Sequence, residues 1–227
     1  MSPKAAGRTI GLILAAQVAL APLVYLRMLG PVRGSGFLES AAANAPQVRL
    51  ALLLSLLYGA MTMAVAVVAW PVLRRQSELA ALAFFTVTLV GVIALLIDDM
   101  GRYELLHLSQ QYGAAGSSQE LVRALGVAAR DSWRMAHFTY ETLAHVTIFT
   151  FNAVMFRGRL IPRWLAGAGM AGTLLAAGTT SMPLVGLRFV PQAIFPMIVV
   201  QLTLIIWLLA RGFADRQIAR SSELSGD

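Results

Sequence analysis

Cysteine is absent from this chain of 227 residues, which excludes disulfide bonds, iron–sulfur clusters and thiolate chemistry. Charge is scarce as well: Asp, Glu, Lys and Arg make up 13% of the residues, against about 25% in an average soluble domain. The sequence also has no nucleotide-binding loop, no Ser-His-Asp order and no HExxH motif. No reaction can be named from motifs, and the sequence leaves open whether the protein is an enzyme.

Apolar residues, in contrast, form 58% of the sequence and give it a mean hydropathy of +0.70. A helix needs about 20 apolar residues to cross the roughly 30 Å hydrocarbon core of a bilayer. The apolar blocks of this chain predict membrane-spanning helices at residues 9–29, 48–73, 79–99, 132–156, 164–185 and 189–209. We therefore expect an all-α integral membrane bundle of six transmembrane helices, a single transmembrane domain over residues 1–227. Residues 34–47 are predicted as a loop, and residues 119–129 as a short amphipathic helix on the membrane surface.

The formal net charge of +7 comes from arginines at the ends of apolar blocks rather than along one polar face, which argues against nucleic-acid binding. Two short interhelical turns are basic, namely Arg74-Arg75 and the segment Arg157–Arg163. Short loops rich in Lys and Arg stay in the cytoplasm. We therefore expect both termini to be cytoplasmic in a multi-pass protein of the cell (inner) membrane, whose first partner is the lipid bilayer.

A polar stripe interrupts the fourth apolar block. His137, Glu141 and His145 follow one another at spacings of four and so lie on one face of a helix, with Arg134 before them and Asn152 after them. An ionisable group at bilayer depth costs roughly 2.5–3.5 kcal/mol on insertion scales, so its presence calls for an explanation. Two explanations stay open: Glu141 and His145 simply pair with each other, or the stripe forms a functional site.

The depth of the polar residues predicts which of them meet. At 1.5 Å of rise per residue, Asp98, Asp99 and His137 all lie roughly 29 Å from the inner ends of their spans. Glu104 and His107 form an E-x-x-H pattern of the kind that binds di-iron centres in helical bundles, but His107 would lie near 42 Å, outside the core. Asp98 also has Arg102 four residues after it. We expect a polar funnel that opens outward between the third and fourth spans, with His145 at its floor. The candidates to line it from the other spans are Gln17, Tyr25, Tyr58, Gln192 and Gln201.

The chemistry of these residue types gives each a predicted role. Imidazole and carboxylate groups suit zinc or iron, so His137, Glu141 and His145 are the candidate metal ligands. Glu141 and His145 are also the candidate catalytic acid and base. The candidate binding residues are His137, Asp98, Asp99, Arg134 and Asn152. A haem ligated by His145 is less favoured, because no other span holds a histidine in its core.

The succession of apolar blocks, and above all the segment RGRLIPRWLAGAGMAGTLL (Arg157–Leu175), resembles an uncharacterised bacterial family of polytopic membrane proteins, domain of unknown function 4386. Its members show a similar turn of the form R-x-x-x-L-P-R-x-L-G and a similar basic turn before the third span. His137 matches a histidine that they often carry at the outer start of the fourth span. The chain departs from the family at Leu54–Leu57, which lacks an acidic residue, and at Phe85-Thr86, where an arginine is expected. The resemblance implies a fold and no activity.

Three functions remain open. The favoured one is an intramembrane enzyme or binding protein for a lipophilic or amphipathic small molecule, with or without a metal. The second is a proton-linked transporter or channel in which Glu141 and His145 relay protons, and at six spans it would need a homodimer to enclose a pathway. The third is a non-catalytic membrane subunit or sensor whose polar stripe pairs with a partner helix.

Overall fold

The computed structural model describes residues 1–34, 36–114 and 116–214, and in these ranges the chain is helical with no strand. The long helices are α1 (Pro3–Ala21), α4 (Ala45–Leu73), α5 (Glu78–Ala114), α6 (Gln119–Gly158), α7 (Arg163–Ser181) and α8 (Phe195–Arg211). A π-helical segment, η1 (Pro22–Met28), continues α1. Short helical pieces complete the fold: α2 (Gly30–Arg33), α3 (Phe37–Ala43), η2 (Gly116–Ser118), η3 (Met182–Val185) and η4 (Pro191–Ile194).

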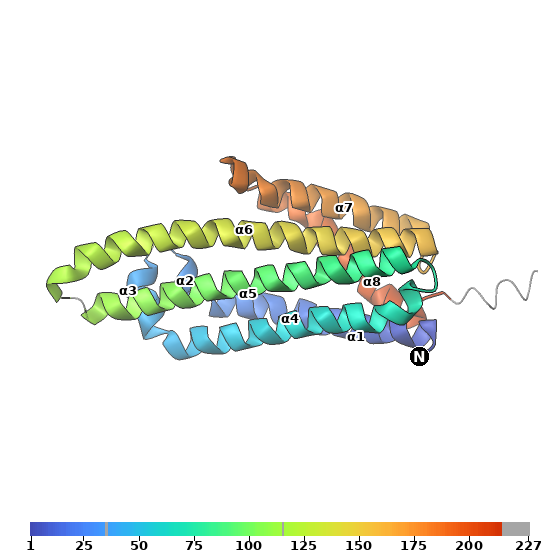
Figure 1. Cartoon of the computed structure of the whole chain (residues 1–227), viewed down its shortest axis with the longest axis horizontal. Helices are drawn as coiled ribbons and strands as arrows, with labels where there is room; N and C mark the ends of the chain where they lie inside the picture. Colours follow the sequence, from blue (N-terminus) through green and yellow to red (C-terminus); the bar gives the residue numbers. More distant parts are fainter. Residues whose placement is uncertain (35, 115, 215–227) are drawn as a thin grey trace, which may run out of the picture.

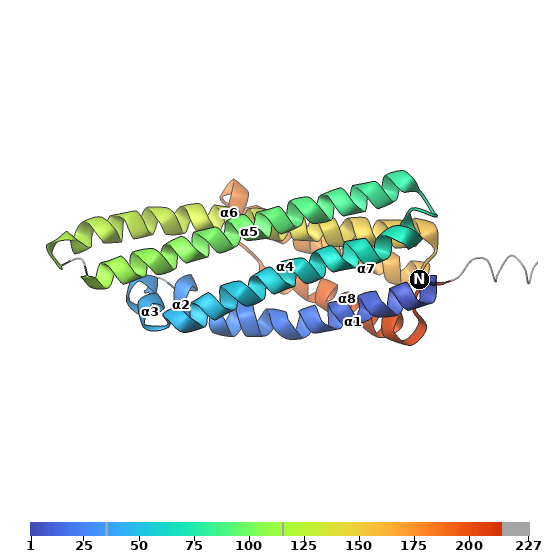
Figure 2. The same cartoon turned by 60° about the horizontal axis from the view of Figure 1, so that its bottom comes forward.

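The six long helices form a closed ring. Each contacts the next in the order α1, α4, α5, α6, α7, α8, and α8 returns to α1. Figure 1 shows the long helices running along one common direction, with the N-terminus at one end, and Figure 2 shows the same arrangement from below. We call the end that carries the N-terminus and the turns at 74–77 and 159–162 the basal end. The opposite end, where α2, α3 and η2 lie, is the distal end.

Both predicted basic turns are present at the basal end. Helix α4 ends at Leu73 and α5 begins at Glu78, and the hydroxyl of Ser77 accepts a hydrogen bond from the backbone N–H of Ala80. The second turn uses Arg159 in the left-handed conformation, with φ of 49°, which is the usual way to terminate a helix. Pro162 then precedes the first residue of α7. Because both turns are short, the helices that they join are antiparallel neighbours.

An apolar core closes the basal end. Its buried side chains come from α1, α4, α5, α6, α7 and α8, and include Ile10, Leu73, Met155, Leu165 and Leu208. Helix α1 meets the backbone just beyond the end of α8 here: a Cβ added to Gly7 would overlap the backbone nitrogen of Phe213. This close approach requires glycine, and it holds the first helix of the chain against the segment that follows the last.

The distal end differs from the sequence-based prediction in two places. Residues 34–47, predicted as a loop, contain α3 and the first turn of α4, and α3 packs on α5 through a hydrogen bond from Ser109 to the carbonyl of Leu38. Residues 119–129, predicted as a separate surface helix, are the first three turns of a continuous α6. No proline interrupts the sequence between this segment and the apolar block, and Phe37 and Leu38 pack directly on Gly126. Helices α5 and α6 therefore reach about 55 and 60 Å, well beyond a hydrocarbon core of about 30 Å.

Four of the predicted spans are long and apolar enough to cross a membrane, namely Pro3–Met28, Ala45–Leu73, Glu78–Ala114 and Pro191–Arg211. Among the described helices, α6 and α7 do not meet the same criterion. Polar residues such as Glu141, His145 and Asn152 lower the hydropathy of α6, although the helix packs between α5 and α7 in the same ring. The structure therefore indicates a helical membrane protein, while six spans and their orientation stay a prediction.

Candidate functional site

The guanidinium of Arg102 is the centre of a buried ion cluster on α5. Its Nη2 lies 2.5 Å from Asp98 Oδ2 and its Nη1 lies 2.6 Å from Asp99 Oδ1. The side chains of Arg102 and Asp98 have no exposed surface, and that of Asp99 is 8% exposed. Spacings of three and four residues on one helix place all three groups on the same face. The predicted pairing of Asp98 with Arg102 is therefore confirmed.

Helix α6 contributes an indole and an imidazole to this cluster. Trp133 Nε1 donates a hydrogen bond to Asp98 Oδ1 at 2.8 Å, and His137 Nδ1 lies 3.2 Å from Asp98 Oδ2. The rings of Trp133 and His137 stack with their centroids 5.5 Å apart. The depth argument had placed Asp98 and His137 at one level of the bundle, and their contact agrees with it. Both oxygens of Asp98 are thereby occupied.

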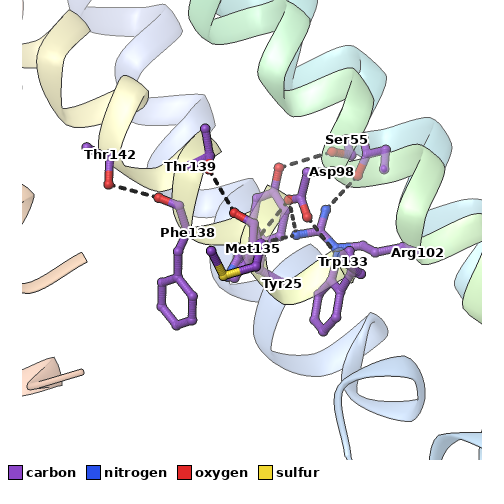
Figure 3. A network of polar contacts seen from close by, with 11 residues as sticks. Tyr25, Ser55, Asp98, Arg102, Trp133, Met135, Phe138, Thr139 and Thr142 are labelled. Atoms are coloured by element: carbon purple, nitrogen blue, oxygen red, sulfur yellow. Dashed lines mark hydrogen bonds and ion pairs between the residues drawn. The ribbon is translucent and has the colours of Figure 1, made fainter. Parts of the chain in front are cut away.

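The third side of the cluster comes from η1 and α4. The hydroxyls of Tyr25 and Ser55 lie 3.0 Å apart, and the Cζ of Arg102 lies 5.3 Å from the centroid of the Tyr25 ring (Figure 3). Cations are attracted to aromatic faces at this range. Tyr25 was a candidate from sequence, whereas Ser55 and Trp133 were missed. Trp133 stands one turn before His137 on the same face, a signal that could have found it.

The cluster is unbalanced in charge and in hydrogen bonds. Two carboxylates surround one guanidinium, so the three groups sum to one negative charge when all are ionised. Asp99 Oδ2 and Arg102 Nε are both buried without a hydrogen-bond partner among the residues that the structure describes. Removing one member of such a buried set exposes the others to the full cost of an unpaired buried charge.

A cavity of about 270 Å³ lies inside the ring on the basal side of the ion cluster. Its walls come from α1, α4, α5, α6 and α8. Leu95 and Tyr140 line it, and they stand three residues from Asp98 and His137 respectively. Val65, Phe84 and Phe151 line its basal side and belong to the basal core. The cavity is thus held between the basal core and the ion cluster.

The cavity lining is apolar with a few neutral polar groups. Gln17 Nε2 donates to Thr62 Oγ1 at 2.7 Å and so is already engaged. Tyr58, Tyr140 and Gln201 also line the cavity, and no side-chain hydrogen bond of these three is present in the described part of the chain. None of the described residues in the lining carries a charge. An apolar wall with a few convergent polar groups is the usual construction of a small-molecule site.

Comparison with known protein families identifies the family of this chain. The family described as "Domain of unknown function (DUF4386)" matches residues 9–212, which is most of the sequence. The chain belongs to this family. No curated protein and no solved structure matches it. Membership in the DUF4386 family confirms the resemblance seen in the sequence and, like it, assigns no activity.

The predicted metal ligands of this DUF4386 protein have separate surroundings. His137 belongs to the ion cluster, whereas His145 is buried two turns away and its Nδ1 lies 3.3 Å from Thr180 Oγ1 of α7. Glu141, between them, is half-buried. In the described ranges, no group of three or more His, Asp or Glu side chains is placed so that it could hold a metal ion. His145 therefore contacts α7 through Thr180, and no hydrogen bond or ion pair between the side chains of His145 and Glu141 is present among the residues that the structure describes.

Two further predicted binding residues lie away from the cluster. Arg134 is exposed on α6, about 100° around the helix from the buried Trp133. Asn152 is buried, donates to the carbonyl of Ile148 at 2.9 Å and packs on Gly169 of α7, where an added Cβ would overlap its amide. Asn152 thus holds α6 against α7.

Three polar residues of the distal half are on the surface. Glu104 and His107 are exposed on the distal part of α5, and His107 pairs with Gln111. Gln192, a candidate for the lining of the funnel, is exposed on η4 and does not line the cavity. The candidate site is therefore the ion cluster together with the cavity beneath it.

Proposed function

We propose that this DUF4386 protein is a six-span protein of the bacterial cytoplasmic membrane that binds a neutral lipophilic small molecule in the cavity of its helical ring. The observation that carries the proposal is the cavity itself, about 270 Å³, lined by residues of five helices in a bundle of membrane-protein character. This volume approaches the lower end of the range of about 300–1,000 Å³ of small-molecule pockets. A molecule dissolved in the bilayer is the natural occupant of an apolar cavity at that depth.

The lining supports a neutral ligand that carries hydroxyl or carbonyl groups. A charged ligand would find no opposite charge among the described lining residues, and an isolated charge in an apolar cavity is strongly disfavoured. The hydroxyls of Tyr58 and Tyr140 and the amide of Gln201 can both donate and accept hydrogen bonds. They therefore favour molecules such as isoprenoid or fatty alcohols and their carbonyl analogues.

The ion cluster serves this site as a rigid distal wall. Asp98 of α5 is tied to Trp133 and His137 of α6, and Arg102 lies against Tyr25 of η1. These contacts fix three walls of the cavity one helical turn beyond Leu95 and Tyr140. A site whose walls are fixed before the ligand arrives loses less free energy in ordering them on binding.

Photolabelling with a diazirine-bearing fatty alcohol tests the proposal. We expect peptide mapping of the protein in nanodiscs to show label on cavity residues from α4, α5 and α6. Substituting Ala144→Phe on the cavity wall should abolish this label, whereas Ala83→Phe on the exposed face of α5 should leave it unchanged. Label confined to lipid-facing positions, or label that Ala144→Phe does not reduce, would show that the cavity binds no such molecule.

A further inference from the structure

Tyr140 of α6 is a buried polar side chain without a partner. It is 8% exposed and lines the cavity, and no hydrogen bond of its hydroxyl is present in the described part of the chain. In the described ranges, the side-chain atoms that are completely buried without a partner are Asp99 Oδ2, Arg102 Nε and Arg130 Nε, and the Tyr140 oxygen is not among them. The hydroxyl therefore stays accessible, and the space that its side chain borders is the cavity.

The position of Tyr140 marks the distal end of the cavity. Its ring packs with Ala94 and Leu95 of α5, and Tyr58 of α4 packs against the same group. The ring of Tyr58 meets that of Tyr25 edge-on at a centroid distance of 6.0 Å, and Tyr25 belongs to the ion cluster. The opposite end of the cavity is lined by apolar side chains of the basal core. An unpartnered polar group thus lies at the distal end, whereas the basal end is apolar.

The cavity borders the outer surface of the ring between α1 and α8. These helices are in close contact at the basal end, where a Cβ added to Gly11 would lie 3.1 Å from Leu208 Cβ. Farther along both helices, from Leu14 of α1 onward, their side chains line the cavity instead. Three of these lining residues are also exposed, by 39%, 44% and 43% respectively: Val18, Ile198 and Leu202. Only one layer of side chains therefore separates the cavity from the bilayer on this side.

Helix α6 stands across the ring from this thin wall, because it is three places from α1 in either direction around the ring. We propose that the cavity takes up the oxygen-bearing end of a single-chain lipid between α1 and α8, that the Tyr140 hydroxyl binds this oxygen, and that the rest of the chain stays in the bilayer. The inference rests on the proposed function and adds the class of ligand and its orientation. A phenol hydroxyl donates a hydrogen bond to an alcohol or carbonyl oxygen.

The free energy of transfer from the bilayer supports this orientation. Lipid chains are as apolar as leucine side chains, so a chain gains little when it moves from the bilayer into an apolar cavity. An oxygen at bilayer depth does gain, because it has no hydrogen-bond partner in hydrocarbon and finds one on Tyr140. The volume of about 270 Å³ also lies below the usual range of about 300–1,000 Å³ for pockets that enclose a whole ligand.

Two photoprobes made from hexadecanol test the orientation, one with a diazirine beside the hydroxyl and one with a diazirine at the far end of the chain. Only the label that excess hexadecanol removes is scored, in nanodiscs of phosphatidylglycerol. We expect the first probe to label residues near Tyr140, such as Leu95 and Ala144, and the second to label exposed positions of α1 and α8. Label from the second probe on Phe84 or Phe151 would place the whole chain inside the cavity and overturn the inference.

Tyr140→Phe tests the hydrogen bond, because it removes the hydroxyl and keeps the ring. It should raise the half-saturating concentration of the hexadecanol probe about fivefold, the loss of one neutral hydrogen bond, and leave that of a diazirine-bearing hexadecane unchanged. Tyr103→Phe, at an exposed tyrosine of α5, is the matched control and should change neither.

The remaining outcomes separate this inference from the proposed function. An unchanged value for hexadecanol in Tyr140→Phe, with the cavity still labelled, would overturn the role of Tyr140 and leave the cavity site standing. An equal loss of hexadecanol and hexadecane would make Tyr140 a structural residue and equally overturn the inference. Absence of removable cavity label from every probe would instead refute the proposed function.

Discussion

Replacing Arg102 by methionine should destabilise the bundle by about 3–5 kcal/mol, the usual cost of removing one partner from a buried ion pair. The guanidinium has no exposed surface and contacts two carboxylates, one of which has none either. Methionine fills a similar volume but leaves Asp98 and Asp99 close together with no cation between them. The variant also loses the contacts of the guanidinium with the rings of Tyr25 and Trp133.

The magnitude can be checked by reversible unfolding in mixed micelles of sodium dodecyl sulfate and dodecyl maltoside, followed by helical circular dichroism. Arg134→Met is the matched control, since this arginine is exposed on α6, and it should change the free energy of unfolding by less than about 0.5 kcal/mol. A triple variant tests the cause. Adding Asp98→Asn and Asp99→Asn to Arg102→Met removes the uncompensated charges, so most of the lost stability should return.

Two results would refute this reasoning. A cost below about 1 kcal/mol for Arg102→Met would mean that the cluster is hydrated or already neutral, because an exposed pair is worth no more than that. A triple variant as unstable as the single one would mean that Arg102 acts through packing rather than through charge. Either result would also remove the ion cluster as the rigid wall of the cavity.

Further predictions concern packing and topology. Gly7→Ala should lower the thermal stability of the purified protein, because its methyl group would overlap the backbone of Phe213, whereas Gly178→Ala should raise it by about 0.5–1 kcal/mol of helix propensity in open space. Since the chain has no cysteine, Ser77→Cys and Ser118→Cys each introduce a single thiol, at the basal and the distal end. A membrane-impermeant maleimide should label Ser118→Cys in intact cells and Ser77→Cys only after permeabilisation; labelling of both from one side would contradict the six-span topology.

The one-dimensional pattern of the sequence determined much of this protein. Apolar blocks interrupted by basic turns predicted an all-helical chain, both turns at the basal end, and the family to which it belongs. The rise of a helix per residue was enough to bring Asp98 level with His137. These features follow from the spacing of apolar residues and the length of the apolar blocks, and both can be read directly from the sequence.

The rotation of each helix about its own axis, and therefore which side chains meet, was decided only by the tertiary structure. The stripe of His137, Glu141 and His145 reads as one site in sequence, but α5 contacts its first member and α7 its last, so it is divided between two interfaces. Ser55 and the cavity could not be foreseen, because their positions depend on how α1, α4 and α8 turn about their own axes. The faces of an apolar helix in a bilayer differ little in hydrophobicity, so hydropathy fixes its depth while side-chain packing alone fixes its rotation.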